Sequence, residues 1–393
     1  MGGRRGAVLR SFEQVNEKIA AGNVVCVTAE ELIEIVQEQG VKEATKQIDV
    51  VTTGTFGPMC SSGAFLNFGH SDPPIRMGRI TLNGVQAYGG LAAVDTYLGA
   101  TQPSDDVGIA YGGAHVIEDL IAGKKVQLRA YSHGTDCYPA KEVEAEITID
   151  ALNQAYLFNP RNAYQNYSAA TNGRDEVIHT YMGTLLPRLS NVTYSTSGQL
   201  SPLLKDPECR AIGVGTRIFF GGAEGYVAWQ GSQFATNSEQ LPNGDMHYSG
   251  GTLALIGDMK QMDARYIRGA SFDGYGVSMF VGVGIPIPVL DEDLCAQLAV
   301  PDAHLYTKIY DYGVPSRNRP DFGYYSYGQL RSGSVELNGR QVPTSSLSSL
   351  KMAREITAKL KDSIVKGEML LQQPIAPLPK DQKQMPLNAR RVK

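Results

Sequence analysis

The sequence predicts an α+β fold with a helical N-terminus, mixed sheets of short glycine-rich strands and a C-terminal helix. Helical patterns gather in the first fifty residues and again near the C-terminus. The middle of the chain carries short apolar segments separated by glycine-rich turns. Helices and strands therefore occur in clusters and do not alternate strictly, which favours α+β over a doubly wound sheet.

The first fifty residues carry clear helix signals. Ser11 can cap a first helix. Thr28 followed by Glu31 is a capping box, and Gly40 ends the helix that this box begins. Helices are therefore expected at residues 11–21, 28–40 and 42–47, followed by a strand at 48–52.

The central region predicts short strands around one helix. Residues 114–122 are helical and Gly123 closes them. The alternating run at 143–149 indicates a half-buried strand. Further strands are expected at residues 126–131, 211–220, 226–229, 252–256 and 277–283.

The C-terminal region predicts one long helix and a tail. Apolar residues follow helical spacing over 346–366, and Gly367 ends the helix. The last residues are rich in Pro, Lys and Gln. We expect one domain over residues 1–370 and an extended or disordered tail over 371–393.

Composition narrows the classes of function. The 393 residues are 42% hydrophobic, and 36 basic and 40 acidic side chains are well interspersed, with a net charge of −4. No basic face stands out, which argues against nucleic acid as a partner. No apolar segment follows the N-terminal arginines, and the apolar run at 275–290 is broken by Gly and Pro. We therefore expect no signal peptide, no membrane partner and a cytoplasmic location.

The five cysteines are odd in number and far apart, with no Cys-x-x-Cys pair. This argues against a disulfide framework and against an iron–sulfur or zinc site built from this chain alone. The histidines are scattered, so no metal site is predicted. Cys26 and Cys295 lie in apolar patterns typical of core residues. Cys209 is expected to lie at the surface or half-buried, without a role in the chemistry.

Cys60 and Cys137 are different. Cys60 lies in the run Thr-Gly-Thr-Phe-Gly-Pro-Met-Cys-Ser-Ser-Gly at 53–63, and Cys137 in Ser-His-Gly-Thr-Asp-Cys-Tyr-Pro at 132–139. Structural cysteines prefer apolar cores, whereas exposed backbone N–H groups and nearby cations lower a thiol pKa. Each cysteine is therefore either a reactive thiolate or a small residue packed in its loop.

The neighbours of each thiol bear on that choice. His133 lies four residues before Cys137 and, as a cation in a turn, would favour the thiolate, whereas Asp136 would oppose it. A helix that began near Ser61 would lower the pKa of Cys60 through its dipole. Alternatively, Ser61 only caps such a helix and Cys60 packs beneath it.

A polar loop is the other candidate. Residues 159–167 read Asn-Pro-Arg-Asn-Ala-Tyr-Gln-Asn-Tyr. Arg161 could hold a substrate carboxylate with a bidentate fork, and Asn162 and Asn166 could bind its polar groups. The alternative is an ordinary loop whose asparagines satisfy their own turns.

These two cysteine loops, the run at 159–167 and Gly-Ile-Pro-Ile-Pro-Val-Leu at 284–290 resemble the homocysteine biosynthesis family of anaerobic archaea and bacteria. The similarity extends from residue 10 to about 370. The family's enzymes are L-aspartate-4-semialdehyde sulfurtransferases, and its two key cysteines correspond to Cys60 and Cys137. Some archaeal members carry CBS domains after this region. A short form without CBS domains is expected here.

The resemblance implies that sulfide and two external electrons convert aspartate semialdehyde to homocysteine. We expect Cys137 to carry sulfur as a persulfide or to engage the aldehyde as a hemithioacetal, and Cys60 to resolve the adduct as a Cys60–Cys137 disulfide. That disulfide requires Cα atoms within about 7 Å. No cofactor bound by this chain is expected. Electrons would come from a separate ferredoxin-like iron–sulfur protein, and the default assembly is a homodimer.

Two other functions remain open from the sequence. A non-catalytic sulfur carrier or iron–sulfur assembly scaffold would need exposed thiols and no small-molecule pocket. A cysteine-dependent acyl transferase would need His133 as a base and an oxyanion hole beside Cys137. Arg161 close to a cysteine would favour the sulfurtransferase.

Overall fold

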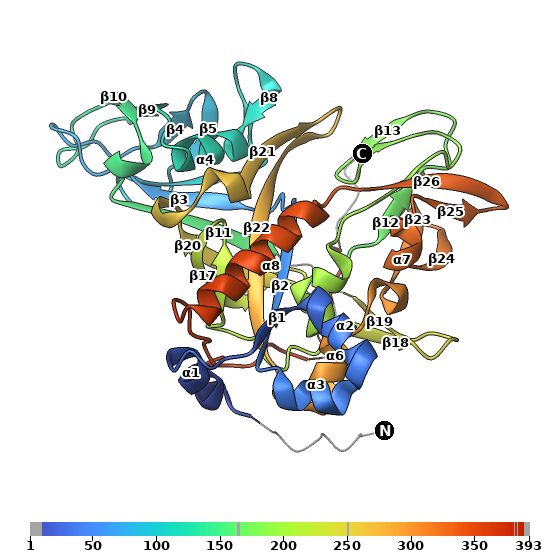
Figure 1. Cartoon of the computed structure of the whole chain (residues 1–393). Coiled ribbons are helices and arrows are strands. Elements are labelled where there is room, and N and C mark those ends of the chain that lie inside the picture. The colour runs from blue at the N-terminus through green and yellow to red at the C-terminus, as the bar shows by residue number, and fades with distance from the viewer. Residues whose placement is uncertain (1–9, 163–165, 250, 381, 383, 389–393) are drawn as a thin grey trace.

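The computed structural model describes residues 10–162, 166–249, 251–380, 382 and 384–388. Its architecture is α+β, as predicted: helices gather at the N-terminus, mixed sheets fill the middle, and one long helix crosses the molecule near its C-terminal end (Figure 1). The helices are α1 (Phe12–Ala20), α2 (Ala29–Gln39), α3 (Val41–Gln47), α4 (Gly113–Ile121), α5 (Pro202–Lys205), α6 (Glu292–Leu298), α7 (Tyr327–Arg331) and α8 (Leu350–Val365).

The helix ends follow the predicted capping signals. Ser11 and Thr28 each form a complete capping box, the first with Gln14 and the second with Glu31, and the backbone N–H of Gly40 closes α2. The last helix begins later than the sequence suggested. Ser349 is its N-cap, because residues 340–346 form a strand that ends at the position where the helix was expected to begin.

One large sheet dominates the described chain, and within this sheet β1–β2 is the single parallel pair among the described residues. Its main path runs β1 (Cys26–Thr28), β2 (Val50–Pro58), β22 (Gly276–Pro288), β16 (Arg217–Phe220), β17 (Ala223–Gln230), β20 (Leu253–Asp258), β11 (Gln154–Asn162), β3 (Gly63–Asn67), β6 (Asp95–Gly99), β5 (Val85–Tyr88), β4 (Arg79–Leu82), β9 (Val126–Tyr131) and β10 (Glu142–Ile147). Three further strands join it off this path: β21 (Ile267–Phe272), β7 (Pro103–Ser104) and β8 (Gly108–Gly112).

A second sheet and two hairpins lie to one side of the large sheet (Figure 1). The second sheet has the order β24 (Asp321–Ser326), β23 (Tyr306–Asp311), β12 (Ala169–Thr171), β15 (Val192–Tyr194), β26 (Arg340–Ser346) and β25 (Ser334–Leu337). The hairpins are β13 (Ile178–Thr180) with β14 (Gly183–Leu185), and β18 (Asn237–Gln240) with β19 (Met246–Ser249).

The β2–β22 ladder is the centre of the molecule, and α8 packs across it (Figure 1). Gly54 on β2 permits this packing, since a Cβ there would lie 2.8 Å from the carbonyl oxygen of Ala353 on α8. Buried Ile356 and Leu360 of α8 belong to the apolar cluster beneath the helix. The ladder ends at Pro58, two residues before Cys60.

Two sequence-based expectations were wrong. The helix predicted from Ser61 does not form. Residues 63–67 are strand β3 instead, because Ala64 and Leu66 are buried while the strand pairs with β6 and β11. The run 159–167, interpreted as a polar loop, begins inside β11, which extends to Asn162. Asparagine is rare in strands, so this asparagine-rich run did not predict one. Residues 163–165, including Tyr164 of the candidate motif, lie outside the described residues.

The described part of the tail lies along the large sheet. Ile375 donates its backbone N–H to Val214, and Val214 donates to Ala376. No helix in the described ranges is both long and apolar enough to cross a membrane.

Candidate functional site

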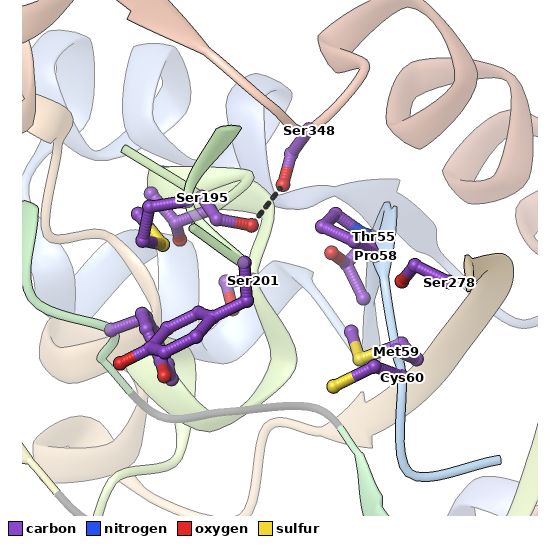
Figure 2. A pocket seen from close by; sticks show the side chains of 12 residues that line it. Thr55, Pro58, Met59, Cys60, Ser195, Ser201, Ser278 and Ser348 are labelled. Atoms are coloured by element: carbon purple, nitrogen blue, oxygen red, sulfur yellow. Dashed lines mark hydrogen bonds between the residues drawn. The ribbon is translucent and has the colours of Figure 1, made fainter. Parts of the chain in front are cut away.

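A pocket opens where the end of β2 faces the second sheet. It holds about 620 Å³ of empty space, open mouth included, and Cys60 lines it. Figure 2 shows Met59 and Cys60 on one side and Ser195 and Ser201 on the opposite side. The lining residues are Thr55, Pro58, Met59, Cys60, Tyr167, Tyr181, Met182, Ser195, Thr196, Ser201, Ser278 and Ser348.

Hydroxyl groups dominate the polar lining, and none of these twelve described residues carries a charge at neutral pH. Ser195 directly follows β15 and Ser348 lies just after β26. Their Oγ atoms are 3.2 Å apart (Figure 2). Hydroxyls both donate and accept hydrogen bonds. The pocket can therefore bind a carbonyl or carboxylate oxygen beside a half-buried thiol.

The turn that carries Cys60 is braced on both sides. The backbone N–H of Met59 donates to Met279 over 2.6 Å, which extends the β2–β22 ladder by one residue. The hydroxyl of Ser62 donates to the carbonyl of Met59, and the amide of Asn159 on β11 donates to Ser62 Oγ over 2.5 Å. Asn159 is thus a positioning residue that the sequence reading left among the other asparagines of its run.

Replacing Asn159 or Ser62 by alanine is expected to loosen this turn. Both side chains are buried, so each variant should lower the free energy of unfolding by roughly 1–3 kcal/mol. Chemical denaturation of the two single variants and the double variant measures the coupling between them. Strictly additive losses would show that the two residues do not act through their shared hydrogen bond.

The electrostatic environment of Cys60 has two opposing parts. Burial raises the pKa of the Cys60 thiol above its ordinary value, and the nearby Arg161 guanidinium lowers it in part. The expected helix dipole is absent, because β3 takes the place of that helix. Burial is the larger effect, so the pocket keeps this thiol mostly protonated at neutral pH.

Arg161→Met is expected to slow alkylation of Cys60 by iodoacetamide and to move its pH profile to higher pH. Removing the cation leaves desolvation unopposed, so the thiolate fraction at pH 8 falls, with a rate loss of about three- to tenfold. Mass spectrometry of the Cys60 peptide gives the rate, and Arg161→Lys is the matched control that keeps the charge. A profile unchanged in Arg161→Met would refute this role for the guanidinium.

Tyrosines form one wall of the pocket. Tyr181 donates or accepts a hydrogen bond with the hydroxyl of Tyr312 over 2.9 Å, and its ring lies edge-on to those of Tyr167 and Tyr275. The guanidinium of Arg319 lies 4.1 Å from the centre of the Tyr312 ring. Burial raises the pKa of Tyr275 and so does the neighbouring Cys60 thiol, which places this tyrosine beside the thiol.

Cys137 lies elsewhere. It is exposed, in the loop between β9 and β10. The hydroxyl of Thr135 is 3.6 Å from its sulfur, and among the described residues no hydrogen bond or ion pair joins His133 to Cys137. The structure thus brings Thr135 to this thiol, a neighbour that the sequence reading did not single out.

The two cysteines lie beyond opposite ends of β3. Cys60 precedes its first residue, Gly63, whereas Tyr138, the neighbour of Cys137, stacks on His70 just past its last residue, Asn67. The five residues of β3 span about 13 Å. A disulfide needs Cα atoms within about 7 Å, so the two thiols of one chain do not meet in this arrangement.

The three predicted substrate-binding residues have different surroundings. Arg161 lies near Cys60 and donates its Nε–H to Ser232 Oγ over 3.0 Å. Asn162 is fully buried at the end of β11. Asn166 donates to the carbonyl of Tyr306 and accepts from the hydroxyl of Tyr327, so protein groups occupy both ends of its amide. Arg161 is the member of this set that the structure brings to the thiol.

The remaining cysteines are structural. Cys26 and Cys295 are buried, as predicted, and burial raises the pKa of Cys26 to about 12. Cys209 is half-buried with a raised pKa. Across the described residues, no three His, Cys, Asp or Glu side chains gather in a way that could hold a metal ion.

Comparison with known proteins gives consistent results. Residues 24–371 match the family described as "Homocysteine biosynthesis enzyme, sulfur-incorporation". The chain is 52% identical over 374 residues to an L-aspartate semialdehyde sulfurtransferase of Methanosarcina acetivorans, covering 95% of this chain and 73% of that protein. It is 52% identical over 379 residues to the enzyme of the same name from Methanocaldococcus jannaschii, covering 93% and 72%. No solved structure matches the chain significantly.

Proposed function

Since the chain belongs to the sulfur-incorporating homocysteine biosynthesis enzyme family, we propose that it is an L-aspartate semialdehyde sulfurtransferase that works through the Cys60 pocket. The observation that supports this site most directly is a half-buried thiol in a hydroxyl-lined pocket with a guanidinium beside it. A non-catalytic sulfur carrier would need only an exposed thiol such as Cys137. It would not need a pocket for a small molecule, so the Cys60 pocket argues against that function.

The overall reaction fixes what the site must achieve. The aldehyde reacts with hydrogen sulfide to give a thioaldehyde and water, and two electrons with two protons then reduce the thioaldehyde to the thiol of homocysteine. Sulfur therefore enters at the oxidation level of sulfide, and the carbon alone is reduced. A site for this reaction needs a nucleophile, a polar pocket for the carbonyl oxygen and a source of two electrons.

We assign the first thiol steps to Cys60, which reverses the order of the two cysteines expected from the sequence, because Cys60 lines the pocket and Cys137 does not. Its sulfur adds to the aldehyde carbon, and the carbonyl oxygen takes up a proton to give a hemithioacetal. Hydrosulfide replaces the hydroxyl, which leaves as water, and the Cys60 thiol departs as the thioaldehyde forms. The Ser195 and Ser348 hydroxyls are suited to donate to the carbonyl oxygen, since both line the same pocket as Cys60 and lie within hydrogen-bond distance of each other.

The reduction then uses both cysteines. Cys60 attacks the sulfur of the thioaldehyde, the carbon takes up a proton, and a mixed disulfide between Cys60 and homocysteine forms. Cys137 attacks the Cys60 sulfur of this disulfide and releases homocysteine, leaving a Cys60–Cys137 disulfide. The two thiols thus supply the two electrons. An external reductant returns two electrons and two protons, and we infer a ferredoxin-like iron–sulfur protein for this role.

Arg161 is proposed to bind the carboxylate of the substrate, because its guanidinium lies close enough to the thiol to lower the pKa of Cys60. We infer a cytoplasmic reaction, since free thiols persist in that compartment.

An anaerobic assay tests the function. The protein is incubated with aspartate semialdehyde, sulfide and a low-potential reductant, and homocysteine is measured by mass spectrometry. Product from wild type and none from Cys60→Ala is the expected result. A wild-type protein that forms no homocysteine with a reductant shown to be competent would overturn the proposal.

A further inference from the structure

The loop that carries Cys137 is tied down at several points. Thr135 and Tyr138 exchange backbone hydrogen bonds of 2.9 and 3.1 Å, and Ser132 donates to Lys141 at the base of the loop. Ala140 donates to Pro74, which joins the loop to the β3–β4 connection. A swing of this thiol past the length of β3 would break these bonds. Cys137 therefore cannot reach the Cys60 of its own chain without local unfolding.

The surface beside this loop has the composition of a protein interface. Three exposed side chains form a row across neighbouring strands of the large sheet. Arg79 on β4 pairs with Tyr131 on β9 and with Tyr88 on β5. Tyr88 is 62% exposed and Tyr131 is 37% exposed, with the Arg79 guanidinium 5.2 Å from the centre of the Tyr131 ring. Tyrosine and arginine are among the residues that are enriched where proteins bind one another. We call these three residues the Tyr-Arg row.

The mouth of the Cys60 pocket has matching features. Tyr275 is 42% exposed there and its ring contacts that of Tyr181, a lining residue. Arg161 places positive charge beside Cys60, whereas Asp136 places negative charge beside Cys137. An apolar rim and opposite charges favour an encounter between the Cys137 loop and this pocket.

We propose that the partner of the Cys137 loop is a second copy of this chain, so that Cys137 of one copy enters the Cys60 pocket of the other. This inference rests on the proposed function, in which the two sulfur atoms must meet. Each copy carries one loop and one pocket, so a two-fold pair completes two sites at once. The Tyr-Arg row lies beside the loop and forms part of the contact.

The chemistry is the exchange step already described, carried out between chains. The Cys137 sulfur of one copy bonds to the Cys60 sulfur of the other, the bond between Cys60 and the homocysteine sulfur breaks, and homocysteine leaves with the proton of the Cys137 thiol. The external reductant then cleaves the intersubunit disulfide with two electrons and two protons.

Mixed dimers test the proposal. Cys60→Ala and Cys137→Ala chains are co-expressed with different tags and purified through both tags, so that each particle holds one chain of each kind. Each variant alone is expected to be inactive. The mixed dimer should regain about half of the wild-type rate, because one of its two sites has both thiols.

The outcomes separate the two proposals. An inactive wild type overturns the proposed function. An active wild type with an inactive mixed dimer, or an active wild type that sediments as a monomer, overturns the intersubunit site and leaves the function standing. Mild oxidation gives a second measurement: wild type should form a disulfide-linked dimer on a non-reducing gel. A linked dimer that persists in Cys60→Ala would contradict the Cys60–Cys137 contact.

Discussion

Replacement of Cys137 by serine is expected to stop turnover and to leave a homocysteinyl group on Cys60. Without the exchanging thiol, the mixed disulfide in the pocket has no partner, and the steady rate should fall by at least about 100-fold. Rapid acid quenching after one turnover, followed by mass spectrometry of the Cys60 peptide without reductant, detects the adduct. Its absence in a variant that has consumed the aldehyde would refute the assigned order of the two thiols.

Three comparisons sharpen this experiment. Cys60→Ser should form neither product nor adduct. An added small dithiol should restore slow turnover to Cys137→Ser, because it can cleave the mixed disulfide, but not to Cys60→Ser. Cys209→Ser is the matched control, since Cys209 is half-buried and lines neither thiol site, and it should keep the wild-type rate.

Replacement of Lys205 by methionine is expected to stabilise the protein near neutral pH. Lys205 is fully buried, and burial lowers its pKa from 10.5 to about 7, against the opposing effects of Asp302 and Glu30. Its ammonium donates to the carbonyl of Val300 over 2.5 Å. A buried charge without full compensation costs stability, so the variant should gain roughly 1–4 kcal/mol at pH 7.

The pH dependence gives this prediction its sign. Between about pH 7 and 10.5 the unfolded chain keeps the Lys205 proton while the folded chain has lost it. Wild-type stability from this group therefore rises with pH across that window, and below it the full penalty remains. The advantage of Lys205→Met over wild type should shrink as pH increases.

Denaturation at pH 7.0 and 8.5 measures this change, and Lys42→Met, at an exposed position, is the matched control. An advantage that stays constant between the two pH values would show that the lysine titrates normally. Comparing variant with wild type at each pH cancels the contribution of the buried thiols.

The parts of the fold that depend on neighbouring residues could be predicted from the sequence. The cap at Ser11 and the capping box at Thr28 predicted the starts of α1 and α2, and β9 has the predicted bounds. The strands at 154–162 and 63–67 could not be predicted. Their stability comes from pairing with distant strands and from burial, which override local propensity.

The candidate site shows the same division. Polar, glycine-broken surroundings singled out Cys60, and the structure places it in a pocket with Arg161 nearby. Ser195 and Ser348 reach this pocket because β15 and β26, the strands before them, pair in the second sheet, and Tyr181 reaches it from the β13–β14 hairpin; no local pattern reveals either placement. The separation of Cys60 from Cys137 likewise follows from strand order. Their distance along the sequence carries no information about it.

The β2–β22 ladder has a consequence for synthesis on the ribosome. Val50 pairs with Pro288 and Pro58 with Phe280, so each pairing closes a loop of more than 200 residues. Such long-range pairing forms slowly and only after its second strand has emerged. The buried edge of β2 must therefore wait, unpaired, through most of translation. The turn that carries Cys60 takes its final shape late, and nascent chains that stall before residue 280 would expose an aggregation-prone edge strand.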